Sequence, residues 1–294
     1  MTIAFVLSGG CSLGAVQVGM LQALSARGVR PDLLVGTSAG ALNAAYVAGH
    51  GAGAGALADL AGVWRGLTRR TLFPVRPGDA FRMVTGGTNA LCPDIGLRRV
   101  VRRHLAFERL EDAPIPLHVV ATDFLSGREV LLSRGDAESA VLASCAVPGI
   151  FPSVHRDGRH LVDGGLADNT AISQAVALGA DRVYVLPSGY SCALTMPPRT
   201  PLGAAAHAIT LLTQQRLVAD VDRFTGEVDL VVLPPPCPMR VAAIDFNHAA
   251  ELVQRGRESA ASCLSRDGGR RSRPAEEVAL HPHDAPATPE ATPA

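Results

Sequence analysis

Short apolar runs alternate along this chain with longer stretches in which apolar residues recur every three or four positions. The first run, residues 3–7, ends at Ser8-Gly9-Gly10 and is too short for a helix, which predicts a buried strand. Apolar residues then recur at helical spacing from Leu13 to Leu24, and Gly28 stands where a left-handed helix cap would fall. The chain therefore begins with a strand, a glycine turn and a helix.

The same unit repeats at once, with a strand expected over residues 32–35, a turn over 36–40 and an alanine-rich helix over 41–48. Further helices are expected over residues 56–67, 96–105, 137–146, 171–178, 204–224 and 247–264. Further strands are expected over residues 117–121, 129–132, 182–186 and 229–233. This alternation predicts an α/β fold, a three-layer helix-sheet-helix sandwich around a mainly parallel central sheet.

Two segments lack periodicity and are expected to be loops, either of which is a candidate border of the functional site. Residues 49–55 are nearly all Gly and Ala, and residues 188–200 are rich in Pro and small polar residues. After residue 264 the composition turns to Arg, Pro, Glu, His and Thr. We therefore expect one domain over residues 1–264 and a disordered Arg/Pro/Thr-rich tail over residues 265–294.

Charge and composition narrow the classes of partner. Lys and Arg number 27 and Asp and Glu number 27, so the charge balance gives no electrostatic reason to expect a nucleic acid. The apolar start lacks a basic leader and is too short for a signal peptide, a lipoprotein leader ending at Cys11 or a membrane span. The expected location is cytoplasmic, with peripheral membrane contact left open.

The cysteines are scattered along the chain, without C-x-x-C pairs and without histidines at the spacing of a zinc finger. This pattern predicts reduced thiols and neither a disulfide framework nor a metal site. The six positions are Cys11, Cys92, Cys145, Cys192, Cys237 and Cys263.

A Gly-x-Ser-x-Gly pentapeptide, Gly36-Thr37-Ser38-Ala39-Gly40, lies between the second predicted strand and the helix after it. A serine on such a sharp turn has a strained backbone and an exposed hydroxyl, and the flanking glycines allow neighbouring chains to approach. The helix N-terminus favours negative charge beside that hydroxyl. The alternative is a glycine-rich turn with an incidental serine, which the strand-to-helix context disfavours. Ser38 is the candidate nucleophile.

A second glycine-rich turn, Ser8-Gly9-Gly10-Cys11-Ser12-Leu13-Gly14, joins the first strand to the first helix. Its free amides are expected beside the Ser38 turn, where they would form an oxyanion hole. A phosphate-binding turn is the alternative. No Gly-Lys-Ser/Thr follows and Cys11 breaks the G-x-G-x-x-G pattern, so nucleotide binding is disfavoured.

Asp163 ends a short apolar run and precedes Gly164 and Gly165. A carboxylate held there could take the proton of the Ser38 hydroxyl. By itself, an Asp-Gly-Gly sequence is typical of an ordinary turn. Two polar residues further on are expected to cap the next helix: Asp168 and Asn169.

Together, the three motifs resemble the patatin-like phospholipase family, in which a glycine-rich oxyanion turn, a nucleophile turn and a later Asp-Gly-Gly/Ala occur in this order. Ala143-Ser144-Cys145-Ala146-Val147-Pro148-Gly149-Ile150-Phe151-Pro152 and Ala121-Thr122-Asp123 also resemble segments of that family. The resemblance covers residues 3–260.

The resemblance implies a Ser-Asp dyad that hydrolyses acyl esters of lipids without a histidine, a metal or a cofactor. It makes Ser38 the nucleophile, Asp163 the base and the amides around Gly9, Gly10 and Cys11 the oxyanion hole. Ser38 would form an acyl-serine, which water activated by Asp163 would hydrolyse. Because the ordinary pKa of aspartate is about 3.9, burial or orientation has to strengthen this base.

Two residues of the oxyanion turn depart from the family pattern. Many members have glycine in place of Cys11 and a basic residue in place of Leu13. A positive φ at Cys11 would cost roughly 1 kcal/mol. Its thiol is interpreted as a small buried group, with a redox switch as the alternative. The missing basic residue leaves contact with an anionic head group open.

Two other functions stay in view. An α/β-hydrolase with a Ser-Asp-His triad is disfavoured because Ser38 follows only the second predicted strand. A catalytically inactive scaffold or lipid-binding protein on the same fold is the other alternative. The candidate triad histidines are His155, His160, His207 and His248.

A cluster of arginines on one predicted helix suggests a transient contact with an anionic membrane surface, and a solvated helix face is its common alternative. The cluster consists of Arg98, Arg99, Arg102 and Arg103.

Overall fold

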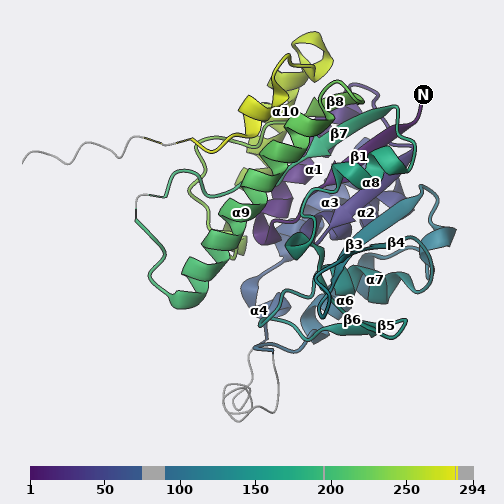
Figure 1. The fold of residues 1–294 in the computed structure, drawn as a ribbon, viewed down its shortest axis with the longest axis vertical. Coiled ribbons are helices and arrows are strands. Elements are labelled where there is room, and N and C mark those ends of the chain that lie inside the picture. The colour runs from purple at the N-terminus through teal and green to yellow at the C-terminus, as the bar shows by residue number, and fades with distance from the viewer. Residues whose placement is uncertain (75–89, 195, 282, 284–294) are drawn as a thin grey trace, which may run out of the picture.

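A central β-sheet lies between two layers of helices in the computed structural model, which describes residues 1–74, 90–194, 196–281 and 283 (Figure 1). Within these residues the sheet has eight strands, in the order β5-β6-β3-β2-β1-β7-β8, with β4 paired to β3. The strands are β1 (Ile3–Leu7), β2 (Leu33–Thr37), β3 (Leu117–Asp123), β4 (Glu129–Leu132), β5 (Val154–Arg156), β6 (Arg159–Asp163), β7 (Arg182–Leu186) and β8 (Asp229–Val232).

The middle of the sheet is parallel. Strand β1 pairs in parallel with β2 and β7, β2 pairs with β3, and β7 pairs with β8, whereas β4, β5 and β6 run antiparallel to their neighbours. Leu7 is in register with Gly36, so the turns after β1 and β2 leave the same edge of the sheet side by side. The predicted α/β sandwich with a mainly parallel sheet is confirmed.

Alternation along β1 divides the core between the two faces of the sheet. Phe5 and Leu7 pack into a core with α1, α2, α3 and α10, whereas Ala4 and Val6 pack with α8 and α9 on the other face. The helices are α1 (Ala15–Ala26), α2 (Ala39–His50), α3 (Ala54–Gly66), α4 (Arg69–Leu72), α6 (Ile95–His104), α7 (Ala137–Ser144), α8 (Ile172–Ala177), α9 (Pro201–Phe224) and α10 (Ala249–Leu264).

Local differences from the predicted boundaries have local causes. The loop expected over residues 49–55 is shorter, because α2 continues to His50 and α3 begins at Ala54. The β5–β6 hairpin was not predicted as a pair of strands. Its signal is Asp157-Gly158, where both residues have positive φ, as a two-residue type I′ turn requires.

Residues that follow α10 are ordered over part of the tail that was expected to be disordered. Val278 is 2% exposed and its carbonyl accepts a hydrogen bond from Gln214 Nε2 at 2.5 Å, while Arg270 pairs with Asp229 of β8. The composition of this segment does not indicate these few buried contacts. Residues 282 and 284–294 of the predicted tail lie outside the described residues, and the domain boundary at residue 264 stays a prediction.

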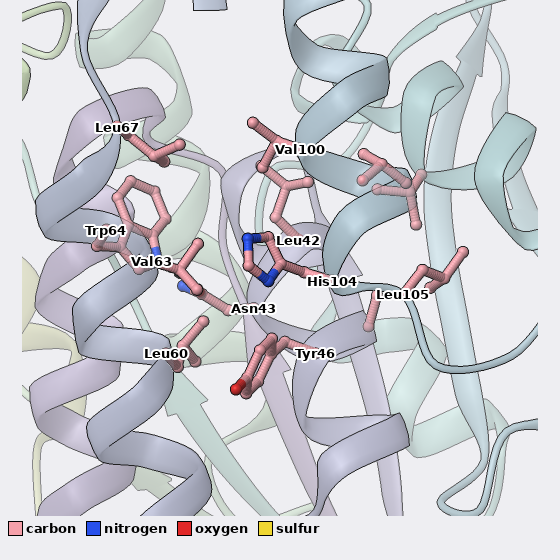
Figure 2. A pocket seen from close by; sticks show the side chains of 13 residues that line it. Leu42, Asn43, Tyr46, Leu60, Val63, Trp64, Leu67, Val100, His104 and Leu105 are labelled. Atoms are coloured by element: carbon pink, nitrogen blue, oxygen red, sulfur yellow. Dashed lines mark hydrogen bonds between the residues drawn. The ribbon is translucent and has the colours of Figure 1, made fainter. Parts of the chain in front are cut away.

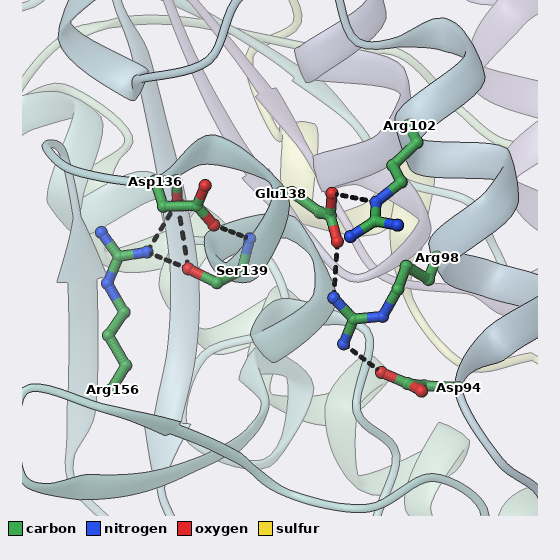
Figure 3. A network of polar contacts seen from close by, with 7 residues as sticks. All are labelled: Asp94, Arg98, Arg102, Asp136, Glu138, Ser139 and Arg156. Atoms are coloured by element: carbon green, nitrogen blue, oxygen red, sulfur yellow. Dashed lines mark hydrogen bonds and ion pairs between the residues drawn. The ribbon is translucent and has the colours of Figure 1, made fainter.

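Two of the clustered arginines of α6 are engaged by α7 (Figure 3). Arg98 Nη1 lies 2.5 Å from Glu138 Oε1, and Arg102 Nε lies 2.6 Å from Glu138 Oε2. Arg98 also pairs with Asp94 at 2.5 Å. These ion pairs favour the solvated-face interpretation for both arginines.

No helix among the described residues has the length and apolar character required to cross a bilayer.

Candidate active site

Ser38 occupies the sharp turn between β2 and α2, with φ 53° and ψ −121°. A side chain at Gly40 would overlap the carbonyl oxygen of Leu7, and one at Gly36 would lie 2.7 Å from Ala41 Cα. Both glycines of the pentapeptide are thus required by close approach of backbone to backbone, as predicted. The left-handed conformation of a non-glycine residue is strain typical of a functional turn.

The Ser38 hydroxyl donates a hydrogen bond of 2.6 Å from Oγ to Oδ2 of Asp163. Asp163 is the last residue of β6, and β3 pairs with both β2 and β6, so the sheet order brings the two side chains together. The second carboxylate oxygen, Oδ1, accepts the Gly165 amide at 2.8 Å. The glycine after the aspartate therefore fixes the orientation of the carboxylate.

Burial raises the affinity of the Asp163 carboxylate for a proton. Its side chain is 7% exposed, and burial raises its pKa to about 6 although the hydrogen bonds from Ser38 and Gly165 act to lower it. The carboxylate is still ionised at neutral pH, and it binds a proton more readily than an ordinary aspartate does. A raised pKa of this kind is what a carboxylate would require to act as a base near neutral pH.

Sequence reasoning did not single out Ser144, which holds the nucleophile turn. Its Oγ accepts the Ser38 amide at 2.8 Å and donates to the Val120 carbonyl at 2.5 Å. The only signal was its place in the segment that resembles the family. This side chain ties the strained turn to β3.

The glycine-rich turn after β1 lies against Ser38, since a Cβ at Gly9 would stand 3.1 Å from Ser38 Cβ. The Gly9 amide donates to the carbonyl of Asn169 at 3.2 Å and is therefore not free for an oxyanion. Within the described part of the chain, the amides of Gly10 and Cys11 have no hydrogen-bond acceptor. The candidate oxyanion donors are thus reduced from three amides to two.

Asp168 and Asn169 do not cap the next helix, because α8 begins only at Ile172 with no capping side chain. Asp168 Oδ1 accepts the Thr170 amide at 3.0 Å in the preceding turn. Asn169 instead supports the glycine-rich turn through its backbone carbonyl. The helix-cap prediction was wrong because the N-cap position of α8 is Ala171, two residues beyond Asn169 and three beyond Asp168.

Cys11 adopts φ 51°, so this position does carry the backbone strain that a glycine would avoid. Burial raises the pKa of its thiol to about 12, with the neighbouring Asp163 carboxylate adding to the rise. A thiol that stays protonated is a poor redox switch, which favours the packing interpretation. Leu13 is 1% exposed and belongs to the core.

The candidate triad histidines lie elsewhere. His155 and His160 are exposed on the β5–β6 hairpin with their rings 5.3 Å apart, and His248 Nδ1 lies 3.1 Å from Glu251. Neither Ser38 nor Asp163 hydrogen-bonds to a histidine in the described residues. The geometry favours a dyad over the triad.

An apolar cavity of about 70 Å³ opens beside Ser38. Leu42, Trp64 and Leu67 line this cavity and also a second one of about 40 Å³, between α2, α3 and α6 (Figure 2). Near the nucleophile the lining includes Cys11, Cys145, Val147, Ile150, Phe151, Ile244 and Phe246. Ser38 therefore faces a space suited to hydrocarbon and not to a charged group.

A protein-family model and a solved structure both resemble this chain. The patatin-like phospholipase family model matches residues 5–176, more than half of the chain. This chain belongs to the patatin-like phospholipase family. The solved structure of VipD from Legionella pneumophila has the same fold, with a TM-score of 0.53 at 14% identity over 90% of this chain and 66% of VipD.

Among curated relatives, an uncharacterized NTE family protein of Mycobacterium tuberculosis is 30% identical over 188 residues, 61% of this chain and 47% of that protein. The lysophospholipase nte1 of Aspergillus terreus is 26% identical over 279 residues, 87% of this chain and 18% of that protein. The chain thus spans about half, or less, of the length of these relatives.

Proposed function

We propose that this protein is a serine acyl hydrolase of lipid esters, with Ser38 as nucleophile and Asp163 as base. The observation that carries the proposal is the 2.6 Å hydrogen bond from Ser38 Oγ to Asp163 Oδ2, on a strained strand-to-helix turn beside an apolar cavity. Membership of a phospholipase family and a relative named lysophospholipase support a lipid ester as the substrate.

In this mechanism Asp163 accepts and returns a proton once during acylation and once during deacylation. Asp163 takes the hydroxyl proton as Ser38 Oγ attacks the acyl carbonyl, and the oxyanion is bound by the amides of Gly10 and Cys11. The intermediate collapses to an acyl-serine as Asp163 returns the proton to the departing alcohol. Water then gives a proton to Asp163 and attacks the ester, and the proton returns to Ser38 as the fatty acid leaves.

Labelling with a fluorophosphonate probe tests whether Ser38 is activated. We expect stoichiometric labelling of the full chain, mapped by peptide mass spectrometry to Ser38, because only an activated serine attacks this phosphorus centre. Ser144, which lies beside Ser38 with its hydroxyl committed to Val120, is the internal control and should stay unlabelled. A folded chain that does not label would support the inactive scaffold instead.

Leu42→Phe is expected to shorten the acyl chains that the enzyme accepts. Leu42 lines both cavities, so a larger side chain there would reduce the space beside Ser38 and in the neighbouring cavity. We expect kcat/KM for p-nitrophenyl decanoate to fall about 10-fold relative to the acetate ester. Leu212→Phe on α9, where the leucine is 65% exposed, is the matched control and should leave the ratio unchanged. An unchanged ratio in Leu42→Phe would place the acyl chain elsewhere.

A further inference from the structure

Two cysteines and two histidines from three separate segments converge on one point, and none of the four lines the cavity beside Ser38. Cys192 follows β7, Cys237 follows β8, and His281 and His283 come from the segment after α10. One ligand atom from each of these residues lies within 4.8 Å of all the others. Cys192 and His283 are half-buried and the other two are exposed, so an ion can reach the cluster from solvent.

The distances resemble the edges of a metal-ligand tetrahedron. Bond lengths of about 2.3 Å to sulfur and about 2.0 Å to nitrogen give edges of about 3.8 Å between sulfurs, 3.5 Å between sulfur and nitrogen and 3.3 Å between nitrogens. The two sulfurs lie 3.9 Å apart and the two Nε2 atoms 3.1 Å apart. Cys237 Sγ lies 3.0 Å from His281 Nε2 and 3.3 Å from His283 Nε2.

Outer contacts orient two of these ligands. His281 Nδ1 lies 2.9 Å from the Ala279 carbonyl, which can only accept a hydrogen bond, so that nitrogen carries the proton. In the neutral ring the lone pair is then on Nε2, which faces the cluster. The Met239 amide donates to Cys192 Sγ at 3.2 Å, which helps to fix the position of that sulfur. Such outer contacts are typical of metal-binding histidines and cysteines.

We propose that Cys192, Cys237, His281 and His283 bind one Zn²⁺ ion in a closed, structural site. Two thiolates and two neutral imidazoles are a ligand set that zinc prefers, and their two negative charges balance the ion. Four protein ligands leave no open coordination position for substrate, so the site is structural and not catalytic. The sequence did not reveal it because the two cysteines are 45 residues apart and the histidines lie in the presumed tail.

The site would hold together the loops that support the active-site turn. Ala193 donates to the Met239 carbonyl at 3.0 Å, which joins the loops carrying the two cysteines. Earlier in the first of these loops, the Ser188 amide donates to Ser8 Oγ at 2.9 Å. The second loop reaches the same turn, where the Ser12 amide donates to the Ala243 carbonyl at 2.9 Å. Zinc would therefore fix the C-terminal segment and both supporting loops at once.

Metal analysis of the full chain tests the proposal without depending on enzyme activity. After incubation with Zn²⁺ and desalting, we expect about one zinc per chain by plasma mass spectrometry. Cys192→Ala, Cys237→Ala, His281→Ala and His283→Ala should each bind zinc at least about tenfold more weakly and therefore retain less after desalting, since even outer-shell changes weaken zinc binding by 10–100-fold. Cys263→Ala and His155→Ala are the matched controls, because both residues lie outside the cluster, and should retain the zinc of the wild type.

Cobalt separates a specific site from adventitious metal, even where a variant fails to fold. Co²⁺ bound to the wild-type chain should show the intense visible bands of tetrahedral coordination and a thiolate charge-transfer band, and Zn²⁺ should displace both. Wild type that retains no more zinc than Cys237→Ala would overturn the proposal. The wild type could instead bind no zinc, with two of the six thiols missing in a thiol titration. That result would mean that Cys192 and Cys237 form a disulfide and not a metal site.

Discussion

Asp163→Asn is expected to lower kcat/KM for p-nitrophenyl esters by about 10⁴-fold, and Ser38→Ala by at least as much. Asparagine retains the shape of the side chain and can still accept the Gly165 amide, but it cannot take the proton from Ser38 Oγ. The double variant should be no slower than Ser38→Ala alone, because the two groups act as one unit. Steady-state kinetics with p-nitrophenyl esters of several acyl lengths measures kcat/KM for the two single variants and the double variant.

Asp168→Asn is the matched control for this loss. Asp168 is also buried, and burial raises its pKa to about 6, but its carboxylate bonds to the Thr170 amide and faces Arg216 instead of Ser38. Its replacement should leave kcat/KM within about tenfold of wild type, since no proton of the reaction reaches it. An active Asp163→Asn enzyme would mean that the base lies elsewhere and would return the histidine triad to consideration.

The same carboxylate is expected to set the pH dependence of the proposed activity and to contribute to that of stability. With a pKa of about 6, Asp163 should make kcat/KM of the wild type rise with pH and level off above about 6. Because this pKa lies above the ordinary 3.8, the folded protein binds the proton more tightly than the unfolded chain. Its contribution to the free energy of unfolding is thus largest at low pH and falls as pH rises from about 4 to about 6.

Asp163→Asn removes that unfavourable buried charge. At pH 8 the variant should therefore gain stability, by up to about 3 kcal/mol for a shift of roughly two pKa units. Urea unfolding of both proteins at pH 5 and pH 8 measures the difference. A gain of equal size at both pH values would show that the ionised carboxylate is not its cause.

Gly40→Ala is expected to destabilise the fold by about 3 kcal/mol or more. Its Cβ would overlap the Leu7 carbonyl oxygen and lie 2.6 Å from the Ser8 carbonyl oxygen. Both are backbone atoms, so α2 has to move away from β1 and the strained Ser38 turn moves with it. Urea unfolding should show a lower midpoint, and variants too unstable to purify should appear in the insoluble fraction.

Gly55→Ala separates this steric effect from helix propensity. Gly40 and Gly55 are each the second residue of their helices, α2 and α3, but a Cβ at Gly55 would meet no atom within 4 Å. Alanine at Gly55 should add up to about 1 kcal/mol of stability. Equal effects of the two substitutions would contradict the close packing of α2 on β1.

The sequence by itself determined the class of fold and the shape of the nucleophile turn. Both depend on local chemistry, because side-chain periodicity distinguishes strands from helices and glycine alone permits the closest backbone contacts. Strands β4 and β7 have the predicted bounds for this reason. The positive φ of Ser38 follows from the same pentapeptide.

Only the tertiary structure decided which distant groups meet. Ser38 and Asp163 are 125 residues apart, and their contact exists because β3 pairs with both β2 and β6, an order that no local pattern specifies. The engagement of the Gly9 amide by Asn169 is likewise a contact between distant segments. The Cys/His cluster has the same origin, since its ligands are assembled by the ends of β7 and β8 and by a C-terminal segment whose composition alone suggested disorder.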